Sequence, residues 1–243
     1  KVNWSDDALA SHAARIIPSP RSKPELIATS SLLAVIASVD EFGGRVLKRI
    51  GGPSYKNLRE YISMFCETPA SLLEQAAGFD SQSVGAQAER PWGKHDRPDG
   101  VIVVSRGSRT WAALVEVKIG QDKLDAEQVA AYHKMARQLG LDAVVTISNE
   151  VGSAEGDPPS SALGGLRAAD LRKIPVRHLQ WRDLLGDAIS LYRKDLEENI
   201  ADPDQDWILG QWIQYVMDER SDVLIPASLG DGWNETLQLS KKR

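Results

Sequence analysis

Three charged residues near the middle of the chain have the types and the spacing needed for phosphoryl chemistry. Asp99 is followed, after sixteen intervening residues, by Glu116, and Lys118 comes two positions later. Because side chains i and i+2 of a strand point to one face, Glu116 and Lys118 share a face and the valines around them share the other. Charged groups in an apolar strand are costly to bury without a partner, a metal or water. We therefore expect these residues to form a polar site.

Two predicted strands bring the charged residues together. The apolar run at 101–104 is one strand, residues 106–109 are a turn, and residues 110–119 return as the second strand of a hairpin. Asp99 at the start of the first strand can then lie beside Glu116 on the second. Hard cations take oxygen ligands, commonly carboxylates with water and phosphate. The pattern predicts a Mg²⁺ site, also open to Mn²⁺, with Asp99 and Glu116 as ligands and Lys118 beside the attacking water.

An amphipathic helix is predicted directly after the hairpin, over residues 126–139, and a strand follows at 143–148. Gln128 and Tyr132 lie four positions apart on this helix. Residues at i and i+4 share one helix face, so we expect both side chains to point at the same site.

Together these motifs resemble the PD-(D/E)xK nuclease superfamily. The Pro-Asp pair at 98–99 and the Glu-Val-Lys triplet at 116–118 carry the resemblance, and the Gln-x-x-x-Tyr spacing at 128–132 is similar to that of the branch with recombination exonucleases. The resemblance covers residues 90–150 and implies a core of helix, three-stranded meander, helix and strand. It also implies a metal-dependent nuclease in which the Asp and Glu bind the metal and the Lys serves the nucleophile. Gln128 and Tyr132 would orient Lys118 or a phosphate.

The resemblance suggests further site residues. Many members of the superfamily have another glutamate on the first core helix, and Glu41 is the candidate here. None of the upstream glutamates sits in a motif, so three alternatives stay open: Glu60, Glu67 and Glu89. Arg97 and Lys123 flank the site in sequence and are candidates for contacting substrate phosphates, although Lys123 also suits a solvated turn.

Composition and charge limit the classes of function. The chain has 243 residues, a net charge of −5 and a single cysteine, Cys66, which excludes an internal disulfide framework and a zinc site built on several thiolates. No apolar run approaches the roughly 18 residues of a membrane span, so we expect a cytoplasmic protein without a membrane partner. Residues 90–140 hold nine Lys/Arg and six Asp/Glu, whereas residues 195–243 hold four and eleven. A basic balance around the predicted site suits a phosphate backbone.

The predicted fold class is α/β, with a restriction-endonuclease-like core whose central mixed sheet is flanked by helices, and helical additions at both ends. We expect a lead-in or linker at 1–24, with a short helix at about 5–16, a nuclease-like domain at 25–195, and an acidic helical extension packed on the core at 196–243. The spacing of apolar residues predicts helices over 183–198 and 207–218. It also predicts helix over 25–50, either as one helix or as two. Residues 54–64 fit a strand or a helix. Further predictions are a loop at 149–165, a strand at 176–181 and three core tryptophans, Trp181, Trp207 and Trp212.

The expected function is a divalent-metal-dependent nuclease acting on DNA, in a role such as bacterial defence or repair. Two alternatives remain: a catalytically silent nucleic-acid- or ligand-binding module of the same fold, and a protein-interaction subunit whose acidic C-terminal region docks a partner. The sequence does not decide between DNA and RNA, or between endonuclease and exonuclease action. It also leaves open whether the chain is a monomer, a homodimer or part of a partner complex.

Overall fold

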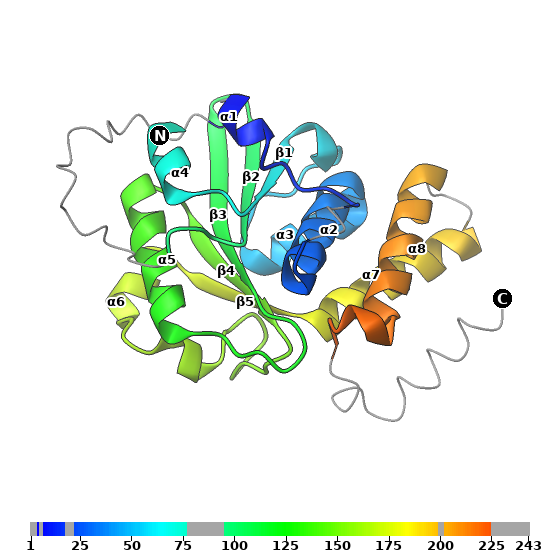
Figure 1. Cartoon of the computed structure of the whole chain (residues 1–243). Coiled ribbons are helices and arrows are strands. Elements are labelled where there is room, and N and C mark those ends of the chain that lie inside the picture. The colour runs from blue at the N-terminus through cyan, green and yellow to red at the C-terminus, as the bar shows by residue number, and fades with distance from the viewer. Residues whose placement is uncertain (1–3, 5–6, 18–21, 77–94, 199–201, 225–243) are drawn as a thin grey trace.

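Five strands form one mixed sheet in which spatial order follows chain order. The computed structural model describes residue 4 and residues 7–17, 22–76, 95–198 and 202–224 (Figure 1). The first three strands pair antiparallel, and the last three pair parallel. Their bounds are β1 (Ile62–Cys66), β2 (Gly100–Arg106), β3 (Arg109–Val117), β4 (Ala143–Ser148) and β5 (Val176–Gln180). The expected α/β class with a mixed central sheet is confirmed.

Helices cover both faces of this sheet, which explains why its central strands read as near-continuous apolar runs. Every residue of β4 is buried, as are the last six of β3. Alternate side chains of β2 enter two separate cores: Ile102 packs with α2, α3, α7 and α8, and Val103 packs with α4 and α5. The helices are α1 (Asp7–Ala10), α2 (Pro24–Ser38), α3 (Asp40–Ile50), α4 (Ala70–Ala76), α5 (Ala126–Leu139), α6 (Ala168–Leu171), α7 (Trp181–Glu198) and α8 (Pro203–Met217).

The helical stretch predicted over 25–50 is two helices, bent by 110° at Val39. A tight crossing accompanies the bend, because a Cβ at Gly43 would lie 2.2 Å from the Ile36 carbonyl oxygen. Only glycine fits that approach without a shift of the backbone. At the other end of α2, Glu25 lies beside Lys118, which follows β3 directly.

Within the part of the chain that the structure describes, no single helix is long and apolar enough to cross a membrane, and α2 with α3 reaches that threshold only as a bent pair.

Helix α5 and strand β4 have the bounds expected from the sequence. The Asp125 side chain caps α5 by accepting a hydrogen bond from the Glu127 amide at 2.9 Å, and Gly140 ends the helix in the left-handed conformation, with φ of +68°. Residues 149–165, expected as a loop, include one short 3₁₀ turn at Ser160–Leu163.

The N-terminal end of the described chain is more closely attached to the sheet than a linker would be. Residues 12–15, predicted as lead-in, run beside β1: the Cys66 amide donates to the His12 carbonyl at 2.6 Å, and the Ala14 amide donates to the Met64 carbonyl at 2.8 Å. The helix expected at about 5–16 is limited to α1. Residues 18–21 lie outside the described residues.

Helix α8 packs its apolar side against α2 and α7, and Trp212 enters the same core as the sheet. Trp181 is also buried, as predicted. The prediction for Trp207 is wrong, because 64% of this residue is exposed. Trp207 and Trp212 are five positions apart and so lie on different sides of the helix. Residues 225–243 of the predicted acidic extension are outside the described part.

Candidate active site

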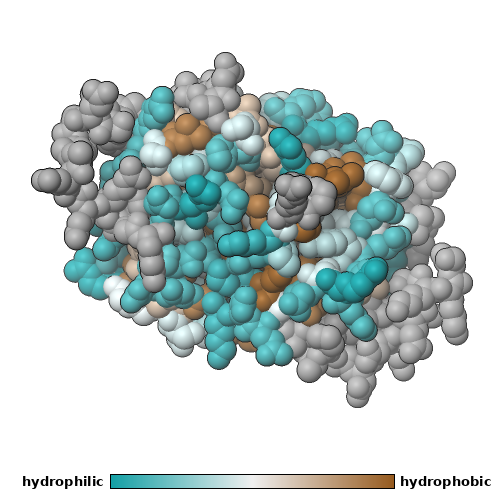
Figure 2. All heavy atoms as spheres, in the orientation of Figure 1, coloured by the Kyte–Doolittle hydropathy of each residue, from teal (hydrophilic) through white to brown (hydrophobic). Residues whose placement is uncertain are grey.

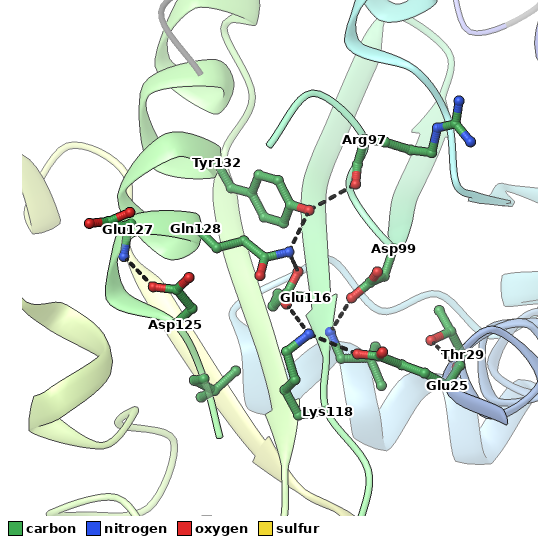
Figure 3. Close-up of polar contacts among 12 residues, drawn as sticks. Glu25, Thr29, Arg97, Asp99, Glu116, Lys118, Asp125, Glu127, Gln128 and Tyr132 are labelled. Atoms are coloured by element: carbon green, nitrogen blue, oxygen red, sulfur yellow. Dashed lines mark hydrogen bonds and ion pairs between the residues drawn. The ribbon is translucent and has the colours of Figure 1, made fainter. Parts of the chain in front are cut away.

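The register of the β2–β3 hairpin places Asp99 and Glu116 side by side. Gly100 pairs with Val115, so the residue before β2 meets the next residue along β3. Asp99 Oδ2 accepts a hydrogen bond from the Val117 amide at 2.7 Å, which fixes this carboxylate against the end of β3 (Figure 3). The predicted neighbourhood of the two acids therefore follows directly from strand pairing.

Glu116 is fully buried, and each of its carboxylate oxygens faces a donor group. Lys118 Nζ lies 2.7 Å from Oε1 as an ion pair, and Gln128 Nε2 donates to Oε2 at 2.7 Å. A buried carboxylate without such partners would be strongly disfavoured. The two contacts hold the Glu116 side chain in one orientation between β3 and α5.

Lys118 comes directly after β3, and its ammonium bridges two carboxylates. Nζ lies 2.7 Å from Glu116 Oε1 and 2.8 Å from Glu25 Oε1, with 16% of the lysine side chain exposed. The lysine backbone is held independently: its amide donates to the Ile147 carbonyl, and its carbonyl accepts from Trp181 Nε1, both at 2.8 Å. The strand end is thus fixed while the flexible stem carries the charge.

Gln128 and Tyr132 share one face of α5 and both point into the site, as their spacing predicts (Figure 3). Gln128 Nε2 also donates to the Tyr132 hydroxyl at 3.0 Å, and this hydroxyl donates to the Arg97 carbonyl at 2.8 Å. Tyr132 is fully buried. Among the described residues, the hydrogen bonds of this pair therefore go to the Glu116 carboxylate and to the backbone two residues before Asp99, and not to Lys118.

Three carboxylates meet at this point, and we call Glu25, Asp99 and Glu116 the carboxylate cluster. One oxygen from each lies within 4.8 Å of the others. Together with Lys118, fully ionised side chains here would carry a net charge of −2. Several convergent carboxylate oxygens are the donor set that Mg²⁺ or Mn²⁺ prefers. The residues present therefore fit a divalent cation.

The pKa shifts of the clustered side chains also fit binding of a cation. Burial raises the pKa of Asp99 and of Glu116 above the ordinary values of carboxyl groups, and the neighbouring acids raise them further. Burial alone would lower the pKa of Lys118, but Glu116, Glu25 and Asp99 together outweigh it and keep this pKa above its usual value. Burial also raises the pKa of the Tyr132 hydroxyl, which stays protonated and acts as a donor. The cluster is thus short of positive charge.

Glu41, the predicted additional acid, is not part of the carboxylate cluster. Glu41 lies on α3, where its side chain is 49% exposed and pairs with Arg45 at 2.6 Å. Glu25, the second residue of α2, belongs to the cluster instead, and it was not among the residues predicted from the sequence. Its only sequence signal is its place directly after Pro24, at the start of the first core helix.

The structure places the other predicted residues differently. Glu60 lies at the end of β1 opposite to Asp99, where it accepts a hydrogen bond from Asn57 Nδ2. Glu67 lies beside Asp99, and its amide donates to the Asp99 carbonyl at 3.1 Å. The Arg97 carbonyl accepts the hydrogen bond from the Tyr132 hydroxyl, while the exposed Arg97 guanidinium points away from the carboxylates (Figure 3). Lys123 is exposed in the loop before α5. Glu89 lies outside the described residues.

The loop that follows Lys118 is held by the first two residues after β4, at the start of the stretch predicted as a loop. Asn149 Nδ2 donates to the Gly120 carbonyl at 3.0 Å and to the Val223 carbonyl at 2.7 Å. Glu150 Oε2 accepts from the Leu124 amide at 2.7 Å. The C-terminal end of the described chain is thereby joined to the loop beside the site.

Comparison of this chain with family models, with curated proteins and with solved structures gives no match.

Proposed function

We propose that this chain is a divalent-metal-dependent nuclease with a restriction-endonuclease-like core, acting on nucleic acid and by preference on DNA. The observation that carries the proposal is the convergence of the carboxylate cluster with Lys118 at the ends of β2, β3 and α2. Three oxygen donors for a hard cation, next to a single ammonium, suit hydrolysis of a phosphodiester. The Asp, Glu, Lys, Gln and Tyr that carry the superfamily resemblance all lie at this point.

Each residue then has a role in the hydrolysis. Glu25, Asp99 and Glu116 would hold Mg²⁺ or Mn²⁺, which when bound polarises a phosphoryl oxygen and acidifies a water. Lys118 orients the attacking water and stabilises negative charge on the phosphate. The water oxygen bonds to phosphorus and gives up one proton to solvent, the bond from phosphorus to one sugar oxygen breaks, and that oxygen takes up a proton from solvent. Gln128 and Tyr132 act as positioning residues for Glu116 and for the backbone that leads to Asp99.

The visible surface of the described residues suits a polar, charged substrate. The described residues on the face seen in Figure 2 are mostly hydrophilic, with apolar residues in small separate groups. Arg97 and Lys123 are exposed before and after the β2–β3 hairpin. Because the Arg97 guanidinium points away from the carboxylates, it is available to phosphates beyond the one that is cleaved. Most protein–nucleic acid contacts of this kind go to the phosphate backbone, so they position a substrate without reading its sequence. A role in bacterial defence or repair would suit such an enzyme.

The test is cleavage by the purified full chain. Linear, circular and single-stranded DNA and RNA are incubated with Mg²⁺ or Mn²⁺, beside Lys118→Ala and Glu25→Gln. We expect metal-dependent cleavage that both substitutions reduce by about 100-fold or more, since they remove the water-orienting group and one metal donor. Glu41→Gln is the matched control, because it removes the same charge from an exposed glutamate on the neighbouring helix, and it should cleave like the wild type.

Retained cleavage in Lys118→Ala would overturn the assignment of the site. Binding of nucleic acid without turnover would favour a silent binding module instead. Stable association with another protein, without affinity for nucleic acid at moderate salt, would favour an interaction subunit.

A further inference from the structure

We propose that the Lys118 ammonium is the resident counter-cation of the carboxylate cluster, and that a divalent cation binds by displacing it. This inference rests on the metal site of the proposed function. Nζ lies 2.8 Å from Glu25 Oε1 and 2.7 Å from Glu116 Oε1, so it takes up two of the three carboxylates that would hold the metal. The ammonium and a metal ion cannot share those contacts unchanged.

The lysine is built so that only its charged end needs to move. Its amide and carbonyl are held by the Ile147 carbonyl and by Trp181 Nε1. The side chain is a flexible four-carbon stem, and 16% of it reaches solvent. An incoming cation can therefore push the ammonium outward, toward the position of the attacking water, without disturbing the end of β3.

Two roles for Lys118 predict opposite effects of removing it. If the ammonium competes with the metal, its loss leaves the carboxylates freer to bind the metal, and affinity rises. If the ammonium only organises the carboxylates for binding, its loss disorders them, and affinity falls. Metal affinity in the absence of any nucleic acid separates these roles independently of turnover.

The first experiment is calorimetric titration of Mn²⁺ into wild type and Lys118→Met at alkaline pH, where protons compete least for the carboxylates. Methionine keeps an unbranched stem and removes the charge. We expect about tenfold tighter binding, as befits the loss of a unit positive charge close to the metal. Lys134→Met, which removes an exposed charge from α5, is the matched control and should bind as the wild type does. Unchanged or weaker binding by Lys118→Met would overturn the inference.

A second measurement uses the wild-type chain, because Lys118→Met leaves buried carboxylates without their cation and risks misfolding. Lysines are reductively methylated with and without Mn²⁺, and modification of each is measured by mass spectrometry. Displacement predicts that Mn²⁺ increases the modification of Lys118 relative to the exposed Lys134. Equal or reduced modification of Lys118 would contradict displacement.

Failure of this inference is distinguishable from failure of the proposed function. If the wild type cleaves nucleic acid in a metal-dependent way but Lys118→Met binds Mn²⁺ with unchanged affinity, the proposed nuclease function stands and the displacement is overturned. If Lys118→Met binds Mn²⁺ more tightly and Mn²⁺ increases Lys118 modification in the wild type, but no nucleic acid is cleaved, the displacement stands and the nuclease function is overturned. No Mn²⁺ binding by either chain would overturn both.

Discussion

The side-chain amide of Gln128 donates to Glu116 Oε2 at 2.7 Å, while Lys118 Nζ lies 2.7 Å from the other oxygen of the same carboxylate. A neutral donor from α5 and a cation from the end of β3 therefore hold one buried acid between them. The amide stays in place when the ammonium moves, so it is the contact that keeps Glu116 oriented for a metal.

Gln128→Ala should consequently weaken Mn²⁺ binding by about 10- to 100-fold, the usual cost of losing a group that orients a metal ligand. Calorimetric titration without nucleic acid measures this effect. Gln138→Ala, an exposed glutamine on the same helix, is the control and should bind as the wild type does. Equal affinities for the two variants would remove Gln128 from the site.

Tyr132→Phe should lower the free energy of unfolding by about 1–3 kcal/mol, because the Arg97 carbonyl loses its buried donor. The phenyl ring still fills the core, so the fold is retained. Denaturant unfolding of the metal-free chain measures the loss, and Tyr215→Phe on α8 is the matched control. A Tyr132→Phe chain as stable as the wild type would show that the Arg97 hydrogen bond contributes nothing net.

Stability of the metal-free protein should fall as pH rises above the range in which exposed carboxylates titrate. Burial raises the pKa of Glu116 in the folded state, so the folded chain binds more protons than the unfolded chain between the two pKa values. Under that condition the free energy of unfolding decreases with increasing pH. Thermal unfolding in a chelator across this range should show a steeper decline for wild type than for Glu116→Gln. Parallel curves would contradict the raised pKa.

The same protons compete with the metal, so Mn²⁺ affinity should increase with pH over that range. Added Mn²⁺ should accordingly raise the melting temperature more at the alkaline end than at the acidic end. A melting-temperature shift independent of pH would indicate that the metal binds elsewhere.

Asn149→Ala should lower the free energy of unfolding by about 1–3 kcal/mol, since the carbonyls of Gly120 and Val223 both lose a donor. Asn57→Ala removes an exposed asparagine whose amide contacts Glu60, and it should cost much less. Hydrogen exchange should also report faster opening at Gly120, whose amide donates to the Val223 carbonyl. Equal stability of the two variants would show that Asn149 does not hold the loop.

The sequence predicted the elements whose signals are local. The β2–β3 hairpin combines apolar runs with a two-residue turn, and α5 has both an Asp125 cap and a Gly140 end. Strand pairing then makes the meeting of Asp99 with Glu116 predictable, and helix periodicity does the same for Gln128 with Tyr132. The positions of these four residues follow from one hairpin and one helix, each formed by residues close in sequence.

The parts that were missed depend on packing between distant segments. Glu25 reaches the site because α2 packs against β1 and β2, and this packing between distant segments is visible only in three dimensions. Nearly every residue in the middle of α2 is buried, so no amphipathic pattern reveals which face meets the sheet. Strand β1 was ambiguous because four of its five residues are buried and show no alternation.

The ion pair between Glu25 and Lys118 joins residues 93 positions apart in the chain. Closing so long a segment carries an entropic cost that must be met before the contact forms, so such contacts slow folding. A chain that has completed its hairpin but has not yet docked α2 holds two carboxylates and a lysine, without the third acid. The full carboxylate cluster therefore exists only in the assembled tertiary structure, and a chain in which α2 is not docked lacks it.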